Sequence, residues 1–137
     1  MESVSRRRRI AAPASVVREN VRDVQPFIEA AGFDEVTVED TRFRIANSVG
    51  LLTIELTLQL LDTEDTLAYE QVDSIFETMV TRYNVDSDGE GTLVTATTGF
   101  SLDVDVVGSI LDGTIIARQR RKELDAQFDY LEAVTAE

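Results

Sequence analysis

The sequence contains no cysteine and no histidine. Without cysteine the chain can form neither a disulfide nor a thiolate nucleophile. Without thiolate and imidazole ligands it cannot build the common zinc sites, and it cannot build a Ser-His or Cys-His catalytic pair. Any catalysis would rest on carboxylates, tyrosines, arginines or the single lysine, Lys122. We therefore predict no resident metal or cofactor and identify no catalytic residue.

Proline, glycine and long apolar runs are also scarce. The 137 residues include 2 prolines and 7 glycines, and no Ser/Gly-rich linker or internal repeat interrupts them. No apolar run approaches the ~18 residues of a membrane span. An arginine run follows Met1, Glu2 and Ser3 without an apolar leader segment. The sequence therefore predicts one soluble, cytoplasmic domain covering residues 1–137.

Basic residues are few beside acidic ones. The chain has 13 basic and 26 acidic residues, a net charge of -13, and all of its basic residues except Lys122 are arginines. Such a surface is hydrated and dispersed in concentrated salt, and it lacks the positive footprint that binding to nucleic acid requires. The composition is typical of an extreme halophile and argues against a nucleic-acid partner.

The first third of the chain is predicted to contain a strand and two short helices. Residues 3–10 are expected to form the strand. Pro13 stands where a helix would begin, and helical spacing follows in Val16, Val17, Val21 and Val24. Pro26 is expected to end that helix, and residues 27–31 to form a second one that Gly32 terminates.

Alternation of apolar and polar residues replaces helical spacing from Phe33 onward. In its clearest stretch one face carries Leu52, Ile54, Leu56, Leu58 and Leu60. Strands are predicted around 36–38, 43–45, 52–60, 67–73, 76–86 and 92–103, with turns at 47–50, 62–66 and 87–91. Helical spacing returns in residues 106–136, for which one long helix is predicted, with a bend near Gly113 allowed. Short turns favour an antiparallel α+β fold in which this helix covers the dry face of the sheet.

Two segments resemble a known superfamily. The sequence IAAPASVV at 10–17 joins the first strand to the first helix, and GEGTLVT at 89–95, followed by Phe100, forms a glycine turn and a last strand. Together with the order of elements, they resemble the SRPBCC superfamily, also called START-like or helix-grip, in its polyketide cyclase/dehydrase-like branch. This resemblance implies a curved seven-stranded antiparallel sheet around the C-terminal helix, with a cavity for a lipid, polyketide or sterol. The Rieske-linked branch is excluded because its iron-sulfur motif needs cysteine and histidine.

Four consecutive arginines in the first strand must divide between its two faces. Arg6 and Arg8 alternate along the strand with the apolar residues Val4 and Ile10 and so lie on the same face as they do. We therefore predict that Arg6 and Arg8 face the helix and that Arg7 and Arg9 face solvent. Each inward guanidinium then needs a carboxylate partner, water at a cavity mouth, or an anionic group on a ligand. Arg6 and Arg8 are therefore candidate ligand contacts.

The remaining candidate ligand contacts follow from the implied cavity. Inward residues of the central strands and of the final helix should line it: Phe43, Ile54, Leu56, Tyr69, Met79, Tyr83, Thr98, Phe100, Ile110 and Thr114.

Three charged motifs are interpreted as surface features. Asp86, Asp88 and Glu90 around Gly89 resemble a calcium loop but lack the later bidentate glutamate. The acidic pairs Glu39-Asp40, Glu64-Asp65 and Asp103 with Asp105 are expected to be solvated. A basic patch of Arg118, Arg120, Arg121 and Lys122 is expected to form local ion pairs such as Arg121 with Asp125.

Three functions remain open. The favoured one is binding or carrying a small hydrophobic or amphipathic molecule, with an anionic head group as one option. The alternative is a polyketide cyclase, dehydratase or hydrolase that uses pocket tyrosine and arginine, for which the sequence reveals no base. The third is a protein-interaction module of the chaperone-activator kind, although no contiguous apolar surface patch is evident.

Overall fold

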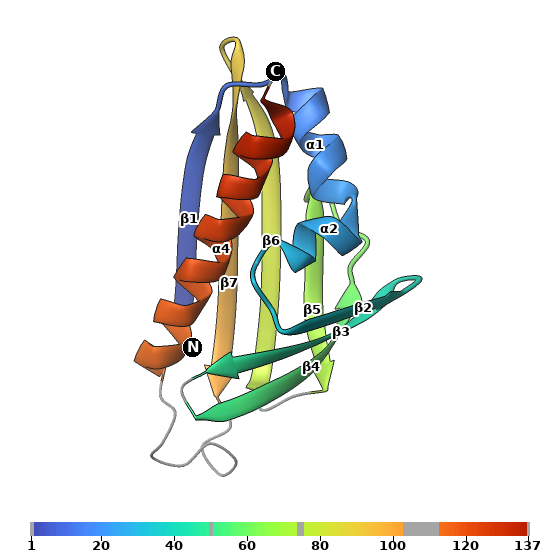
Figure 1. The fold of residues 1–137 in the computed structure, drawn as a ribbon, viewed down its shortest axis with the longest axis vertical. Helices are drawn as coiled ribbons and strands as arrows, with labels where there is room; N and C mark the ends of the chain where they lie inside the picture. The colour runs from blue at the N-terminus through green and yellow to red at the C-terminus, as the bar shows by residue number, and fades with distance from the viewer. Residues whose placement is uncertain (1, 50, 74–75, 103–112, 137) are drawn as a thin grey trace.

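A seven-stranded antiparallel sheet with three helices on one face makes up the described part of the chain (Figure 1). The computed structural model describes residues 2–49, 51–73, 76–102 and 113–136. In chain order the elements are β1 (Glu2–Ile10), α1 (Ala14–Arg22), α2 (Val24–Glu29), β2 (Glu35–Glu39), β3 (Arg42–Val49), β4 (Leu52–Leu60), β5 (Leu67–Asp73), β6 (Phe76–Asp88), β7 (Gly91–Leu102) and α4 (Gly113–Thr135). The predicted α+β architecture is confirmed.

The sheet has the strand order β1-β7-β6-β5-β4-β3-β2, so only β1 pairs with a strand that is distant in sequence. β1 runs antiparallel to β7 from Glu2 opposite Phe100 to Ile10 opposite Thr92. A register shift in β4 between Thr57 and Leu58 accompanies a change in strand direction. As a result, β2, β3 and β4 cross the lower end of the molecule at an angle to the long strands (Figure 1).

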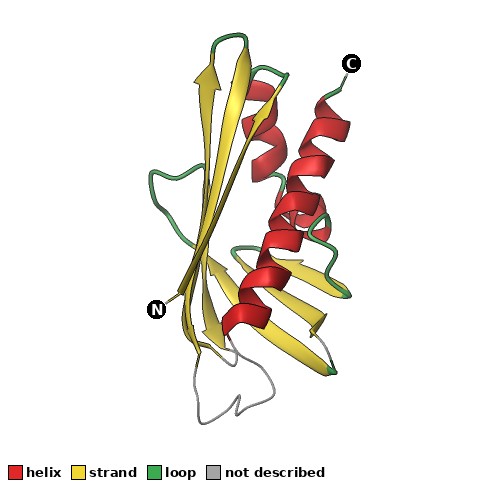
Figure 2. Ribbon diagram, turned by 90° about the vertical axis from the view of Figure 1, so that its left-hand side faces the viewer, coloured by secondary structure: helices red, strands yellow, loops and turns green. Residues whose placement is uncertain are grey.

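The long helix α4 covers the concave face of the sheet (Figure 2). Its buried positions recur at intervals of three and four residues: Ile116, Arg120, Glu123, Leu124, Gln127, Phe128 and Leu131. Predicted helix residues 106–112, including Ile110, lie outside the described residues. Ile115 is 36% exposed, whereas the neighbouring Ile116 is buried. No helix in the described ranges is long and apolar enough to span a membrane.

The two short helices close the upper end of the core. α1 buries Val17 and Val21, and α2 buries Phe27 and Ile28. The expectation that Pro26 ends the first helix was wrong. The break lies at Asp23, and Pro26 sits in the first turn of α2, where its missing N–H has no intrahelical partner to lose.

Turn chemistry was predicted less accurately than strand position. Gly32 has a φ of 92°, as expected for a glycine that terminates a helix. The turn predicted for residues 47–50 was placed too early, because Asn47 pairs with Ile54 inside the β3–β4 ladder. The turn predicted for 87–91 was too long, since β6 continues to Asp88 and β7 begins at Gly91.

Candidate functional site

A small cavity of about 60 Å³ lies between the concave face of the sheet and the first turns of α4. Its walls are mostly aliphatic and aromatic, and its polar groups come from β3, β5, β7 and α4. The lining residues are Phe33, Ile45, Asn47, Ile54, Leu56, Leu58, Tyr69, Phe76, Met79, Thr98, Phe100, Ile116, Gln119, Arg120 and Glu123. The structure thus brings together predicted contacts from four strands: Ile54, Leu56, Tyr69, Met79, Thr98 and Phe100.

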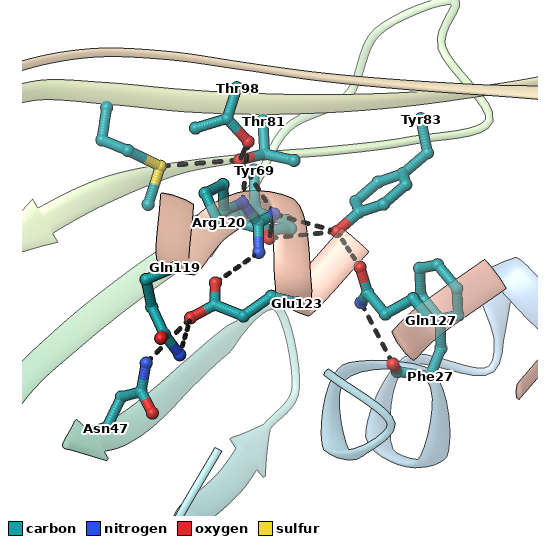
Figure 3. Close-up of polar contacts among 11 residues, drawn as sticks. Phe27, Asn47, Tyr69, Thr81, Tyr83, Thr98, Gln119, Arg120, Glu123 and Gln127 are labelled. Atoms are coloured by element: carbon teal, nitrogen blue, oxygen red, sulfur yellow. Dashed lines mark hydrogen bonds and ion pairs between the residues drawn. The ribbon is translucent and has the colours of Figure 1, made fainter. Parts of the chain in front are cut away.

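Arg120 projects from α4 toward the sheet (Figure 3). Its side chain is 9% exposed. Nε donates to the Thr98 hydroxyl at 2.8 Å, and Nη2 donates to the hydroxyls of Tyr69 and Tyr83 at 2.7 and 3.0 Å. Burial lowers the pKa of Arg120, but Tyr69, Tyr83 and the Glu123 carboxylate outweigh it and raise that pKa overall. The guanidinium is therefore a fixed, buried cation.

Glu123 balances this charge one helical turn away. Nη1 of Arg120 donates to Oε1 of Glu123 at 3.0 Å, and the glutamate side chain is 8% exposed. Oε2 accepts hydrogen bonds from Nδ2 of Asn47 at 2.8 Å and from Nε2 of Gln119 at 3.2 Å. Because hydrogen bonds satisfy both charged groups, this ion pair can be stable in a low-dielectric core.

A chain of hydrogen bonds continues from Arg120 toward α2 (Figure 3). The Tyr83 hydroxyl donates to Oε1 of Gln127 at 2.8 Å, and Nε2 of Gln127 donates to the carbonyl of Phe27 at 3.1 Å. The Tyr69 and Tyr83 hydroxyls lie 3.3 Å apart, so Tyr69 is the donor of that pair. Burial raises the pKa of Tyr83 well above its ordinary value. Tyr83 is consequently a neutral structural link in this chain.

Arg6 and Arg8 face α4, as their parity predicts, but they lie outside the cavity lining. Arg6 pairs with Asp125 at 3.3 Å, and Arg8 pairs with Asp129 and Glu132 at 2.6 Å each. Hydrogen bonding to Asp129 is the main cause that raises the pKa of Arg8. Of the three alternatives for these arginines, the structure shows the carboxylate partner.

Of the other predicted contacts, some are buried behind the cavity lining and one is exposed on the surface. Phe43 packs edge-on against Tyr69 with ring centres 5.1 Å apart, and Tyr83 packs in the same way against Phe27 at 5.0 Å. Both residues are buried behind the lining. Thr114 is exposed and does not line the cavity. Ile110 lies outside the described residues.

The polar end of the cavity was missed by sequence reasoning. Arg120 was assigned to an exposed basic patch, and that assignment was wrong. The signal was its spacing, because Arg120 stands four residues after Ile116 and four before Leu124 on the buried stripe of α4. Asn47 was assigned to a turn, and Glu123 was not singled out as a candidate.

Two of the acidic motifs form surface contacts. Asp88 pairs with Arg9 at 3.2 Å, next to Gly89, whose φ is 64°. Asp65 is less solvated than predicted, because its side chain is 16% exposed and pairs with Arg82 at 2.6 Å. Burial raises the pKa of Asp65, but hydrogen bonds from Asn84, Thr63 and Arg82 outweigh it and lower that pKa overall. In place of the expected Arg121–Asp125 pair, Asp125 pairs with Arg6.

Solved structures match this fold over nearly the whole chain, whereas neither a protein-family model nor a curated protein matches the sequence. TTHA0849 from Thermus thermophilus is 18% identical, with a TM-score of 0.76 over 98% of this chain and 100% of that one. A START superfamily protein from Mycobacterium smegmatis is 12% identical, with a TM-score of 0.73 over 97% and 96% of the two chains. The chain has the helix-grip fold of START-like proteins.

The same fold is shared with an aromatase/cyclase. The Zhui aromatase/cyclase from Streptomyces sp. R1128 is 20% identical, with a TM-score of 0.74 over 96% of this chain and 93% of that one. At these identities the likeness establishes the helix-grip fold, whereas activity has to be argued from the residues of the cavity.

Proposed function

We propose that this helix-grip domain binds a small, mainly apolar molecule between its sheet and α4. The observation that carries the proposal is the cavity itself. Its walls combine a continuous apolar surface with a few convergent polar side chains, which is the usual composition of a small-molecule site. The polar groups stand at one end, on Asn47, Gln119, Arg120 and Glu123, so the site suits a molecule with an apolar body and a polar end.

The cavity volume limits what this site can hold without rearrangement. A volume of about 60 Å³ is well below the roughly 300–1,000 Å³ of typical small-molecule pockets. A ligand of ordinary size therefore requires lining side chains to move. Met79 is the most adaptable of them because its unbranched side chain has three rotatable bonds. Phe76 at the lower end of β6 is only half-buried, so it can move with little loss of burial.

Binding can be tested with N-phenyl-1-naphthylamine, an uncharged dye that fluoresces in apolar surroundings. We expect saturable enhancement with the wild-type domain. Leu56→Trp should abolish it, because the larger ring fills the cavity. The matched control is Leu93→Trp on β7, which lies outside the lining. Absence of saturable binding in the folded wild type, or equal loss in both variants, would refute the proposal.

A second function, catalysis, is favoured by one observation. The structure supplies at the cavity the buried carboxylate that the sequence did not reveal, namely Glu123. Three hydrogen-bond donors, one of them Arg120, already engage both oxygens of this carboxylate, so neither oxygen is free to take a proton from a substrate. Binding is therefore the better supported function. Conversion of a poly-β-ketone thioester by wild type but not by Glu123→Gln would instead make catalysis the better supported function.

A further inference from the structure

Two carboxamide groups at the polar end of the cavity have hydrogen-bonding capacity left over. Asn47 is only 6% exposed, and Gln119 is half-buried on α4. The amide nitrogen of each donates to Oε2 of Glu123. The Glu123 carboxylate fixes the orientation of both amides. Its oxygen can only accept hydrogen bonds, so each amide must turn its NH2 group, and not its carbonyl oxygen, toward it. Both carbonyl oxygens consequently point elsewhere.

Those two carbonyl oxygens lack a hydrogen-bond partner within the described ranges of the chain. Neither Oδ1 of Asn47 nor Oε1 of Gln119 accepts a hydrogen bond there, and each amide nitrogen retains a second N–H. Both residues line the cavity. The hydroxyls of Tyr69 and Thr98 are, by contrast, already engaged with Arg120. A ligand's polar end therefore meets carboxamides that can both accept and donate.

The charge at this end of the cavity is already balanced. Among the described lining residues only Arg120 and Glu123 are charged, and they pair with each other at 3.0 Å. A carboxylate placed beside the carboxamides would lie close to the carboxylate of Glu123. An ammonium group would lie close to Arg120. Because Arg120 and Glu123 are both buried, water screens neither repulsion well, and burying an additional charge is costly.

We infer that the polar end of this cavity selects an uncharged group that both donates and accepts hydrogen bonds, of which a hydroxyl is the simplest. The hydroxyl donates to the free amide oxygen of Asn47 or Gln119 and accepts from the neighbouring amide N–H. The inference rests on the proposed binding function and names its ligand class. It replaces the anionic head group that the arginines of β1 suggested from sequence.

The test compares probes that share one alkyl chain. 1-Octanol, octanoate and octylammonium are used at neutral pH and fixed KCl to displace N-phenyl-1-naphthylamine from the wild-type domain. We expect octanol to bind at least about tenfold more tightly than either charged probe. Equal displacement by all three would overturn the inference while leaving the proposed function intact, because dye binding alone tests the latter.

Variants then identify the groups responsible. Asn47→Leu should weaken octanol binding, and Asn20→Leu on α1 is the matched control with no effect. Glu123→Gln leaves Arg120 unbalanced, so the preference for octanol over octanoate should fall by about tenfold or more. Glu132→Gln, on the same helix but outside the lining, should preserve the preference. An unchanged preference in folded Glu123→Gln would contradict the inference. If Glu123→Gln does not fold, the wild-type probes and Asn47→Leu decide.

Discussion

At the scale of single residues, Arg120 is the organising side chain of the core. One guanidinium joins Thr98 on β7, the two tyrosines of β5 and β6, and Glu123 on α4 (Figure 3). A guanidinium can do this because its five N–H donors project in one plane in different directions. The cluster therefore fixes α4 over the sheet by direction as well as by apolar contact.

We predict that Arg120→Met strongly destabilises the domain. Removal of the cation leaves Glu123 buried without its ion-pair partner, a change that costs about 3–5 kcal/mol in buried pairs. Urea unfolding in fixed KCl measures the effect. Arg121→Met, an exposed neighbour on the same helix, is the control and should change stability by no more than about 0.5 kcal/mol. A similar small change for Arg120→Met would show that the buried pair contributes little.

Sequence reasoning recovered the apolar wall of the cavity but not its polar end. Ile54, Leu56 and Phe100 were predicted because the resemblance implied a cavity and alternation along a strand determines which side chains face it. Arg120 and Glu123 were missed because charged residues in a helix are usually solvated, and their neighbours Arg121 and Lys122 are exposed. Their burial depends on partners from distant strands, and a local pattern cannot reveal such partners.

At the scale of elements, α4 is attached unequally to the sheet. Ion pairs from Arg6 and Arg8 join its middle and last turns to β1, and Arg8 also lies 5.4 Å from the centre of the Phe128 ring. The first turns of α4, which line the cavity, precede the residues that form these ion pairs. We therefore expect this end of the helix to move when the structure widens around a ligand.

We predict that Arg8→Gln loosens α4 without affecting ligand selectivity. The Arg8 side chain is 28% exposed and its partners are more so, and ion pairs of this kind contribute about 1 kcal/mol or less. Thermal melts should show a small decrease in Tm that diminishes at high salt. Arg7→Gln, on the opposite face of β1, should have a smaller effect. A change in the preference for octanol over octanoate in Arg8→Gln would show that Arg8 takes part in ligand binding.

Element types were more predictable than element ends. Strands β2 to β7 follow runs of alternating or continuous apolar residues, and their antiparallel order follows from short turns, whereas β1 carries four consecutive arginines. The break between the first two helices was misplaced because proline is as acceptable in a first turn as it is disruptive in an interior. Whether a proline stands in a first turn or in a helix interior depends on the backbone hydrogen bonds around it, and the sequence pattern does not distinguish the two positions.

At the scale of the whole molecule, the charge balance is the dominant property. The net charge of -13 falls on a chain of 137 residues, and most of the acidic side chains that the structure describes are exposed. Mutual repulsion among such charges opposes compaction when salt is dilute. We propose, on this ground, that the protein is adapted to concentrated salt.

This proposal predicts that stability increases with salt. Raising KCl from dilute to molar concentration shortens the screening length from about 30 Å to about 3 Å and removes most of the repulsion. A gain of about 2 kcal/mol would raise Tm by roughly 8 °C in a domain of this size. Calorimetric scans across the KCl series measure it. A Tm that does not change over the series would rule out adaptation through surface charge.

The pairing of β1 with β7 determines the order in which the fold can be completed. β1 is made first, yet its register joins Ile10 to Thr92 and Glu2 to Phe100, so its partner strand leaves the ribosome only after β2 to β6. Closing so long a loop is slow compared with forming the local hairpins of the meander. Until β7 is available, the β1 segment remains unpaired and exposed to solvent. Its four consecutive arginines keep it hydrated and discourage its pairing with a wrong sheet edge. The charges that later attach α4 thus first protect the nascent chain.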